Sequence, residues 1–130
     1  MITLADVRNW LKSFDIAEHY YIGKLDNKQT KSLGVYTLKT NTPPVTAIGN
    51  VSTYDIMGVS LLLHYNNNAN ETETTARKLY EQLRTAKNVT IGNTTVYMLQ
   101  LMQCEPVDVG TDDSGVYERV IELQIYYERN

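Results

Sequence analysis

The side chains able to act as nucleophiles, bases or metal ligands are few and lie far apart in this sequence. The chain has two histidines, His19 and His64, and one cysteine, Cys104. Neither histidine has a partner at the spacing that zinc sites use, and Cys104 lies in no nucleophile motif. The sequence therefore predicts no catalytic, cofactor-binding or metal site. Both histidines are expected at the edge of the core, and Cys104 is expected to be a half-buried structural thiol.

Acidic residues gather in the segment 108–115, which contains Asp108, Asp112 and Asp113. The segment lacks the twelve-residue pattern and closing glutamate of a calcium loop. Its glycines do not open a helix, so it is no phosphate-binding loop. We expect an irregular polar turn between two strands.

The stretch after this turn alternates strictly between two kinds of side chain. Glu118, Glu122 and Gln124 fall on one face. The opposite face carries Tyr117, Ile121, Leu123, Ile125 and Tyr127. A period of two predicts a long β-strand with one acidic face. Such a charged surface suits assembly better than catalysis.

Two helices are predicted to pack on the sheet that holds this strand. Thr3 and Asp6 have the spacing of a helix cap, and apolar residues then recur to about Phe14. Asn70 precedes the second helix, which should span about 71–87 with acidic residues first and basic residues last.

The remaining periodicity predicts strands and turns around these helices. Residues 54–65 are apolar on both faces, which favours a central strand, and residues 91–94 predict a hairpin turn. Strands are expected at 19–25, 34–39, 54–65, 95–104 and 116–127. The fold class is therefore α+β, one domain over 1–130, with two helices on one face of a mixed, mostly antiparallel sheet. The element order is α-β-β-β-α-β-β.

Composition narrows the function classes. The chain of 130 residues has 12 basic and 15 acidic residues, a net charge of −3, which argues against a broad nucleic-acid-binding patch. Ten tyrosines against one phenylalanine favour either an interface or half-exposed strands of a monomer. With no signal-peptide pattern, a lone cysteine and no long apolar run, we expect synthesis in the cytoplasm and no membrane partner.

Several segments, taken together, resemble the bacteriophage tail terminator family, whose members are also known as tail-completion or minor capsid proteins. The matching segments are the strand 31–36, the strand 58–65 leading through an Asn-rich loop to the helix 76–83, and the closing strand 115–127. The resemblance implies a structural virion protein of the head–tail interface, made in the host bacterial cytoplasm. It implies a ring, usually hexameric, that caps the tail tube, stops its growth and joins it to the head. The implied partners are copies of the chain, the tail tube protein and a head-completion or connector protein. No catalytic residue is implied.

A ring of this chain would leave room for DNA as passing cargo. A compact domain of this length has a radius of gyration of about 14 Å, and six such discs leave a hole about one disc wide. Duplex DNA is roughly 20 Å across, and carboxylates facing it would repel its phosphates. The candidates for channel or interface positions are Glu118, Glu122, Asp112, Asp113, Pro43, Pro44 and Tyr54. Pro43 and Pro44 belong to an irregular segment, 40–53, that we expect to order against a neighbour.

Two other readings remain open at this level. The first is a monomeric α+β domain that binds a small ligand or acts as an enzyme, using the tyrosines and Cys104 in a pocket. The second is a subunit like those of the tail tube, which would polymerise into filaments. Native mass and negative-stain microscopy distinguish all three readings.

Overall fold

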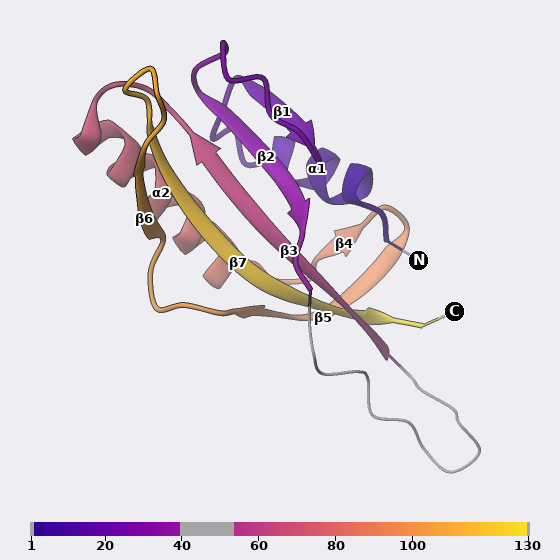
Figure 1. The fold of residues 1–130 in the computed structure, drawn as a ribbon. Coiled ribbons are helices and arrows are strands. Elements are labelled where there is room, and N and C mark those ends of the chain that lie inside the picture. The colour runs from indigo at the N-terminus through magenta and orange to yellow at the C-terminus, as the bar shows by residue number, and fades with distance from the viewer. Residues whose placement is uncertain (1, 40–53, 130) are drawn as a thin grey trace.

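The computed structural model describes residues 2–39 and 54–129 and confirms the expected α+β class and order of elements (Figure 1). The elements are α1 (Leu4–Lys12), β1 (His19–Ile22), β2 (Ser32–Thr37), β3 (Tyr54–His64), α2 (Ala69–Arg84), β4 (Thr90–Ile91), β5 (Thr94–Leu101), β6 (Val107–Thr111) and β7 (Tyr117–Glu128). Two short strands, β4 and β6, are additional to those expected.

Seven strands of the described part form one sheet with the order β1-β2-β3-β7-β5-β4, and β6 lies beside β7. β1 and β2 are parallel, and the other neighbours are antiparallel, so the sheet is mixed and mostly antiparallel as predicted. β3 lies between β2 and β7, which confirms its central position. β5 and β6 share one side of β7: β5 pairs with its C-terminal part and β6 with its N-terminal part.

The start of α1 follows directly from the local sequence. The Asp6 backbone N–H donates to Thr3 Oγ1 at 3.2 Å, and the Thr3 N–H donates to Asp6 Oδ2 at 3.0 Å. This reciprocal capping box satisfies two donors that the first turn leaves unpaired. The helix ends at Lys12, two residues before Phe14, which packs edge-on against Trp10.

The predicted cap of α2 was wrong by two residues. Asn68, not Asn70, is the N-cap, and its Oδ1 accepts the Glu71 N–H at 3.1 Å. Asn66 explains the choice, because its side chain accepts the Asn68 N–H at 2.9 Å and donates to Glu71 Oε2 at 2.8 Å. In a run of asparagines the residue with a supporting turn becomes the cap. The helix also ends earlier than expected, at Arg84.

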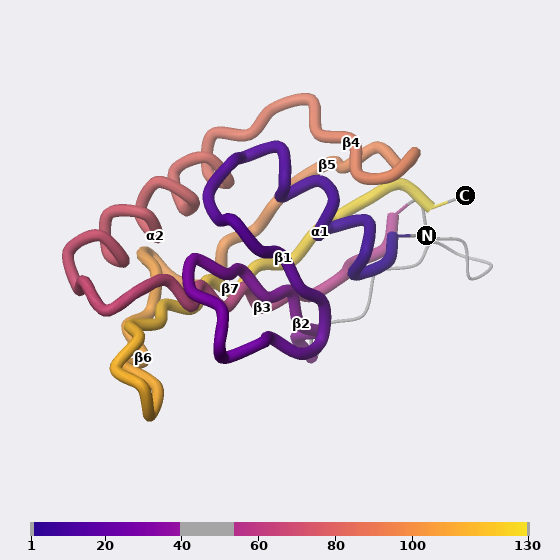
Figure 2. Tube along the Cα trace, turned by 90° about the horizontal axis from the view of Figure 1, so that it is seen from above, coloured from indigo at the N-terminus to yellow at the C-terminus, as the bar shows by residue number. Residues whose placement is uncertain are grey.

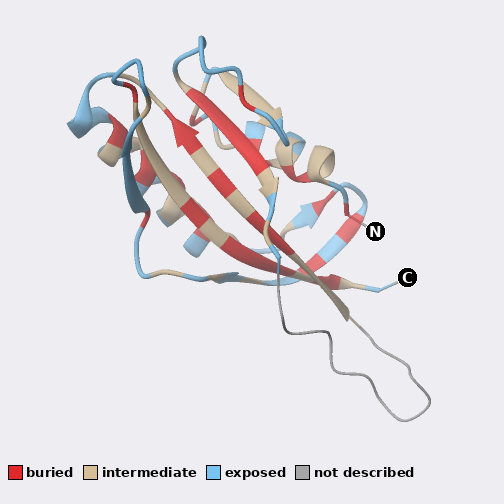
Figure 3. Ribbon diagram, viewed as in Figure 1, coloured by how far each residue is buried: buried red, intermediate tan, exposed pale blue. Residues whose placement is uncertain are grey.

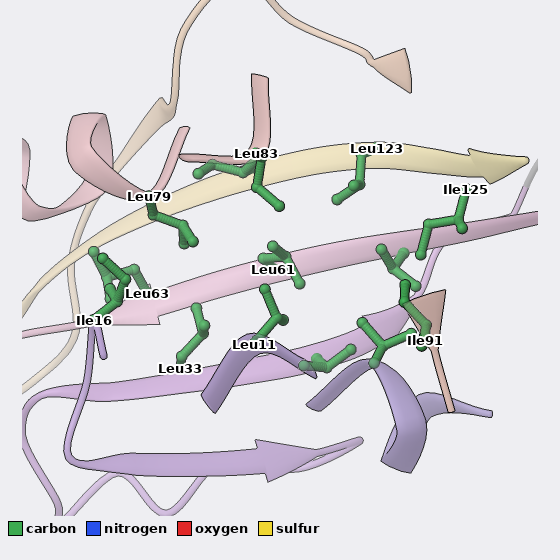
Figure 4. Close-up of a cluster of buried hydrophobic side chains, with 14 of the residues drawn as sticks. Leu11, Ile16, Leu33, Leu61, Leu63, Leu79, Leu83, Ile91, Leu123 and Ile125 are labelled. Carbon is green, nitrogen blue, oxygen red and sulfur yellow. The ribbon is translucent and has the colours of Figure 1, made fainter. Parts of the chain in front are cut away.

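Both helices lie on the same face of the sheet (Figure 2). The core forms between them and the sheet, where Leu11 of α1, Leu79 and Leu83 of α2, Leu61 of β3 and Leu123 of β7 are fully buried (Figure 4). Alternation along β3 and β7 supplies the two strand residues, since every second side chain faces the helices. The apolar faces predicted for β3 and β7 are therefore confirmed.

The β1–β2 connection covers one corner of the opposite face of the sheet. Leu25 from this connection is buried, and its side chain lies over Gly34 together with the Tyr36 ring. A Cβ at position 34 would meet Tyr36 Cε1 at 2.8 Å and Leu25 Cδ1 at 3.3 Å, so glycine is needed for this close packing. Burial raises the pKa of the Tyr36 phenol, and a hydrogen bond with the Leu25 backbone opposes that rise.

The acidic segment is more regular than the sequence indicated. Val107–Thr111 forms strand β6, which pairs with β7 with an irregular register between Asp108 and Thr111. Gly110 lies in this irregular stretch with φ +85°. Glycine and aspartate interrupt the alternation of side chains that would indicate a strand in the sequence. Pairing with the neighbouring β7 stabilises β6. The turn itself is confined to Asp112–Gly115.

Candidate assembly interface

The face of the sheet away from the helices carries most of the predicted site residues. We call it the open face, because no helix of the described part of the chain covers it. Figures 1 and 3 view the sheet from this side, with partly buried segments running along β3 and β7. The open face includes Ser60, Leu62 and His64 of β3, Glu118, Glu122, Gln124 and Tyr126 of β7, and Met98 and Gln100 of β5.

His64 is a fully enclosed polar residue of this face. It is 0% exposed, and its Nδ1 lies 2.9 Å from Glu118 Oε2, the residue opposite it on β7. Its Nε2 lies 3.7 Å from Asp112 Oδ2 and forms no hydrogen bond within the described residues. Both ring nitrogens face carboxylates, and a carboxylate offers no hydroxyl or thiol proton that the imidazole could remove. The arrangement ties β3, β7 and the acidic turn together.

Asp112 organises that turn. Its Oδ1 accepts the Ser114 N–H at 2.9 Å and the Val116 N–H at 3.0 Å. The Val116 hydrogen bond is the main cause that lowers the pKa of the Asp112 carboxyl, with further contributions from Ser114 and the charge of His64. The carboxylate that the sequence suggested for a channel therefore also has a local structural role.

Hydrogen bonds of polar side chains link β7 to β5 and to the segment that follows β5, and α2 supports that segment. Gln103 Nε2 donates to Glu122 Oε1 at 2.8 Å, and the Tyr80 hydroxyl donates to the Gln103 carbonyl at 2.7 Å. The Tyr126 hydroxyl donates to Gln100 Oε1 at 2.9 Å. These bonds join β5, β7 and α2, which holds the polar side chains in defined positions.

Aromatic residues and a methionine form a patch on the open face, where β3 begins and β7 ends. The Tyr54 and Tyr126 rings stack with centroids 5.9 Å apart. With Tyr97 and Met98 they line a hollow of about 250 Å³, and these last two side chains are 59% and 49% exposed. Tyrosine and methionine are enriched at the centres of protein interfaces. Tyr54, a predicted interface candidate, is thus part of a surface of the expected kind.

The structure brings together only some of the predicted site residues. Glu118 and Asp112 meet at His64, while Asp113 is exposed at the tip of the β6–β7 turn. Glu122 lies further along β7 on the same face as Glu118. Pro43 and Pro44 lie outside the described residues.

The expectations for the three chemically reactive residues need two corrections. Cys104 is exposed, not half-buried, because it lies just beyond β5, where the chain leaves the sheet. His64 is fully buried, not at the core edge, because the Asp112 turn and Glu118 cover it. His19 is partly buried and stacks on Tyr21.

Within residues 2–39 and 54–129, no group of three or more histidine, cysteine or acidic side chains is arranged to bind a metal ion. No helix there has the length and apolar character needed to cross a membrane.

Sequence reasoning missed the contact of His64 and the contribution of Gln103. Both depend on which residues lie opposite each other in the sheet: His64 faces Glu118 in the β3–β7 register, and Gln103 follows β5 toward Glu122. The period of two assigns each residue to a face, so His64 and Glu118 could have been placed on one face from the sequence. Their register depends on the whole sheet.

The fold and the open face define a class of protein: a small α+β scaffold whose described polar side chains pair with one another across strands. A family model described as "Bacteriophage tail terminator protein" matches residues 3–129. The chain therefore belongs to this family and is a structural, tail-completion protein of the bacteriophage virion. The family resemblance found in the sequence is thereby confirmed.

The comparison with solved structures includes a protein titled "Structure of bacteriophage SPP1 gp17 protein". It has 11% sequence identity to this chain and a TM-score of 0.44, and the match covers 98% of this chain and 85% of that chain. No curated protein matches the chain.

Proposed function

We propose that this protein forms a closed ring, of six copies, that caps the tail tube, ends tail assembly and joins the tail to the head. The observation that carries the proposal is the family match over residues 3–129. The proposed partners are further copies of the chain, the tail tube protein and a head-completion or connector protein. The chain is made in the host cytoplasm and ends at the head–tail interface of the virion.

The shape and charge of the chain support a ring that lets DNA pass. A compact 130-residue domain has a diameter of about 36 Å, scaled from its radius of gyration. Six discs of this diameter leave a central hole wider than duplex DNA, which is roughly 20 Å across. The net charge of −3 favours sliding over binding, because basic residues would hold the phosphate backbone by releasing counterions.

Within this proposal the four acidic candidates have different roles. Glu118 and Asp112 lie beside His64, and each of their side chains is 18% exposed. They hold the β6–β7 hairpin in place. Glu122 on the open face presents its charge to the channel or its rim, and Asp113 at the exposed tip contributes to the contact with a neighbouring subunit. Pro43, Pro44 and Tyr54 contribute to contacts with a neighbouring subunit or the tube.

Negative-stain microscopy and native mass spectrometry of the purified protein test the ring. Closed rings of one size are expected. Filaments would instead support a subunit like those of the tail tube, and single particles at all concentrations would support a monomeric domain. A phage that lacks the protein should produce tails of irregular length without heads, and adding the purified protein should restore joining.

The channel assignment has its own test. A phage carrying Glu122→Lys should assemble but deliver its genome more slowly, since a lysine attracts the passing phosphates. Glu73→Lys on α2 is the matched control, with the same charge change on the helix-covered side. Unchanged delivery by the Glu122→Lys phage would contradict the channel position of this residue.

A further inference from the structure

The exposed large hydrophobic side chains of the described residues lie at the two outer edges of the sheet. Ile22 is on β1, at one edge. The others are Tyr97 and Met98 of β5, Met102, and Val107 and Val109 of β6, all on the opposite side. Monomeric proteins seldom leave such residues grouped at sheet edges.

Strands β1 and β6 each pair with one neighbour in the described structure, β2 and β7 respectively. All five residues of β6 are exposed, with Val107 at 39% and Val109 at 48%, and Ile22 at the end of β1 is 40% exposed. Each edge therefore presents backbone hydrogen-bonding groups beside an apolar side chain, which is a template for pairing with another strand.

The directions of the two edge strands are compatible. β1 is parallel to β2, and each of the steps from β2 to β3, β3 to β7 and β7 to β6 is antiparallel. β6 therefore runs opposite to β1. A second copy placed beside the first, with its sheet facing the same way, brings its β1 antiparallel to β6, the better of the two pairing geometries.

The two edges also differ in charge. Residues 105–115 contain Glu105, Asp108, Asp112 and Asp113 and no lysine or arginine, a formal charge of −4. Residues 22–31, the end of β1 and the following connection, contain Lys24, Lys28 and Lys31 against Asp26, or +3 − 1 = +2. Asp108 lies 3.7 Å from Arg119 of its own β7, so Asp113 at the exposed tip is the better partner for a neighbouring lysine. Opposite charges favour contact between unlike edges over contact between like edges.

We propose that the β6 edge of one copy contacts the β1 edge of the next copy, so that the sheet continues from subunit to subunit. The proposal rests on the ring proposed above and names its subunit interface. The contact joins two different surfaces, so it repeats head to tail and closes into a ring when the rotation allows. It covers Ile22 of β1 and Val107 and Val109 of β6. The irregular pairing of β6 near Gly110 limits its accessible length, which disfavours unspecific strand addition.

Cysteine crosslinking tests which edges meet. In a Cys104→Ser background, Ile22→Cys is introduced into one preparation and Val109→Cys into another. A short bismaleimide should give covalent dimers only when the two are mixed, and a chain with both substitutions should give a ladder that ends at the ring size. Val109→Cys mixed with Lys78→Cys is the control, because Lys78 is exposed on α2 and belongs to neither edge strand.

A charge swap tests the same contact without crosslinking. Asp113→Lys and Lys28→Asp should each weaken assembly, on the order of tenfold in dissociation constant for an exposed charge pair. The double variant, with both charges exchanged, should recover assembly. Thermal unfolding of each variant checks that the monomer fold is unchanged.

The outcomes separate this interface from the ring itself. Rings that form without the 22–109 crosslink and without recovery by the charge swap would overturn the interface and leave the ring standing. Monomers in every measurement would overturn both. Crosslinking of Val109→Cys with itself would show a two-fold contact and would overturn the head-to-tail arrangement.

Discussion

The two faces of the sheet are built from the same strands but from different chemistry. Along β3, Leu61 and Leu63 face the helices and are at most 2% exposed, whereas Leu62 between them faces the open side and is partly buried. Along β7 the same alternation places Leu123 and Ile125 against the helices. The open side carries instead tyrosines, glutamines and glutamates that bond across strands.

The two faces contribute differently to stability and to contact with other molecules. Aliphatic burial against two helices supplies the hydrophobic stabilisation of the fold. The open face holds its side chains in place by hydrogen bonds and stacking, which contribute less to stability and leave a defined surface for contact. Substitutions on the two faces should therefore differ in what they damage.

The largest expected effect comes from neighbouring leucines of β3. Leu61→Ala should lower the free energy of unfolding by about 2–5 kcal/mol, because it leaves a cavity in the core. Leu62→Ala, the same change one residue away on the open face, should lower it by about 1 kcal/mol, since less apolar surface is removed from water in the native state. Urea unfolding followed by circular dichroism measures both values, and equal losses would contradict the comparison.

A smaller effect is expected for the polar cluster of the open face. His64→Ala should lower the free energy of unfolding by about 1–3 kcal/mol, because the Glu118 carboxylate loses its hydrogen-bonded partner in a poorly exposed position. Glu118→Gln, which keeps an acceptor near Nδ1, should cost less. Urea unfolding again gives the values, and a larger loss for Glu118→Gln than for His64→Ala would show that the charge matters more than the packing.

The smallest effect should be a local change with pH. The pKa of Asp112 is lowered in the folded state, chiefly by the Val116 hydrogen bond, from an ordinary value of 3.8. Its contribution is therefore present above that ordinary pKa and is lost as the pH falls through the lower, folded value. The protection of the Ser114 and Val116 amides from hydrogen exchange, measured relative to their intrinsic exchange rates, should fall in this acid range.

Matched substitutions test the assignment of that acid transition. Asp112→Asn should remove the pH dependence of the protection at Ser114 and Val116, while Asp113→Asn at the exposed tip should preserve it. His64 Nε2 lies 3.7 Å from Asp112 Oδ2 and is unchanged in both variants. If the acid transition persists in Asp112→Asn, another carboxyl causes it.

Local signals explain which parts of the fold could be predicted. The Thr3–Asp6 capping box acts over one turn, and the alternation of β3 and β7 extends along single strands, so each is visible in a short stretch of sequence. The helix-covered core followed from the same patterns. The family resemblance also rested on these apolar spacings, and the family match over residues 3–129 confirms it.

Long-range pairing explains the errors at β6 and His64, and a local turn explains the error at the cap of α2. Strand β6 has glycine and aspartate in place of a clear alternation, and its pairing with β7 supplies the missing signal. The cap of α2 moved to Asn68 because Asn66 supports that turn, a choice among equivalent asparagines. The buried position of His64 depended on a turn some 48 residues further along the chain, at Asp112.

The order of side chains along this chain was enough to establish the α+β class, the two faces of its long strands and its family, because period and capping are properties of neighbouring residues. The sheet register then determined which polar residues meet: Glu118 and Asp112 at His64, and Glu122 at Gln103. It also left β1 and β6 at the two edges. Register and edges depend on how all the strands pack together, and no single stretch of sequence carries that information.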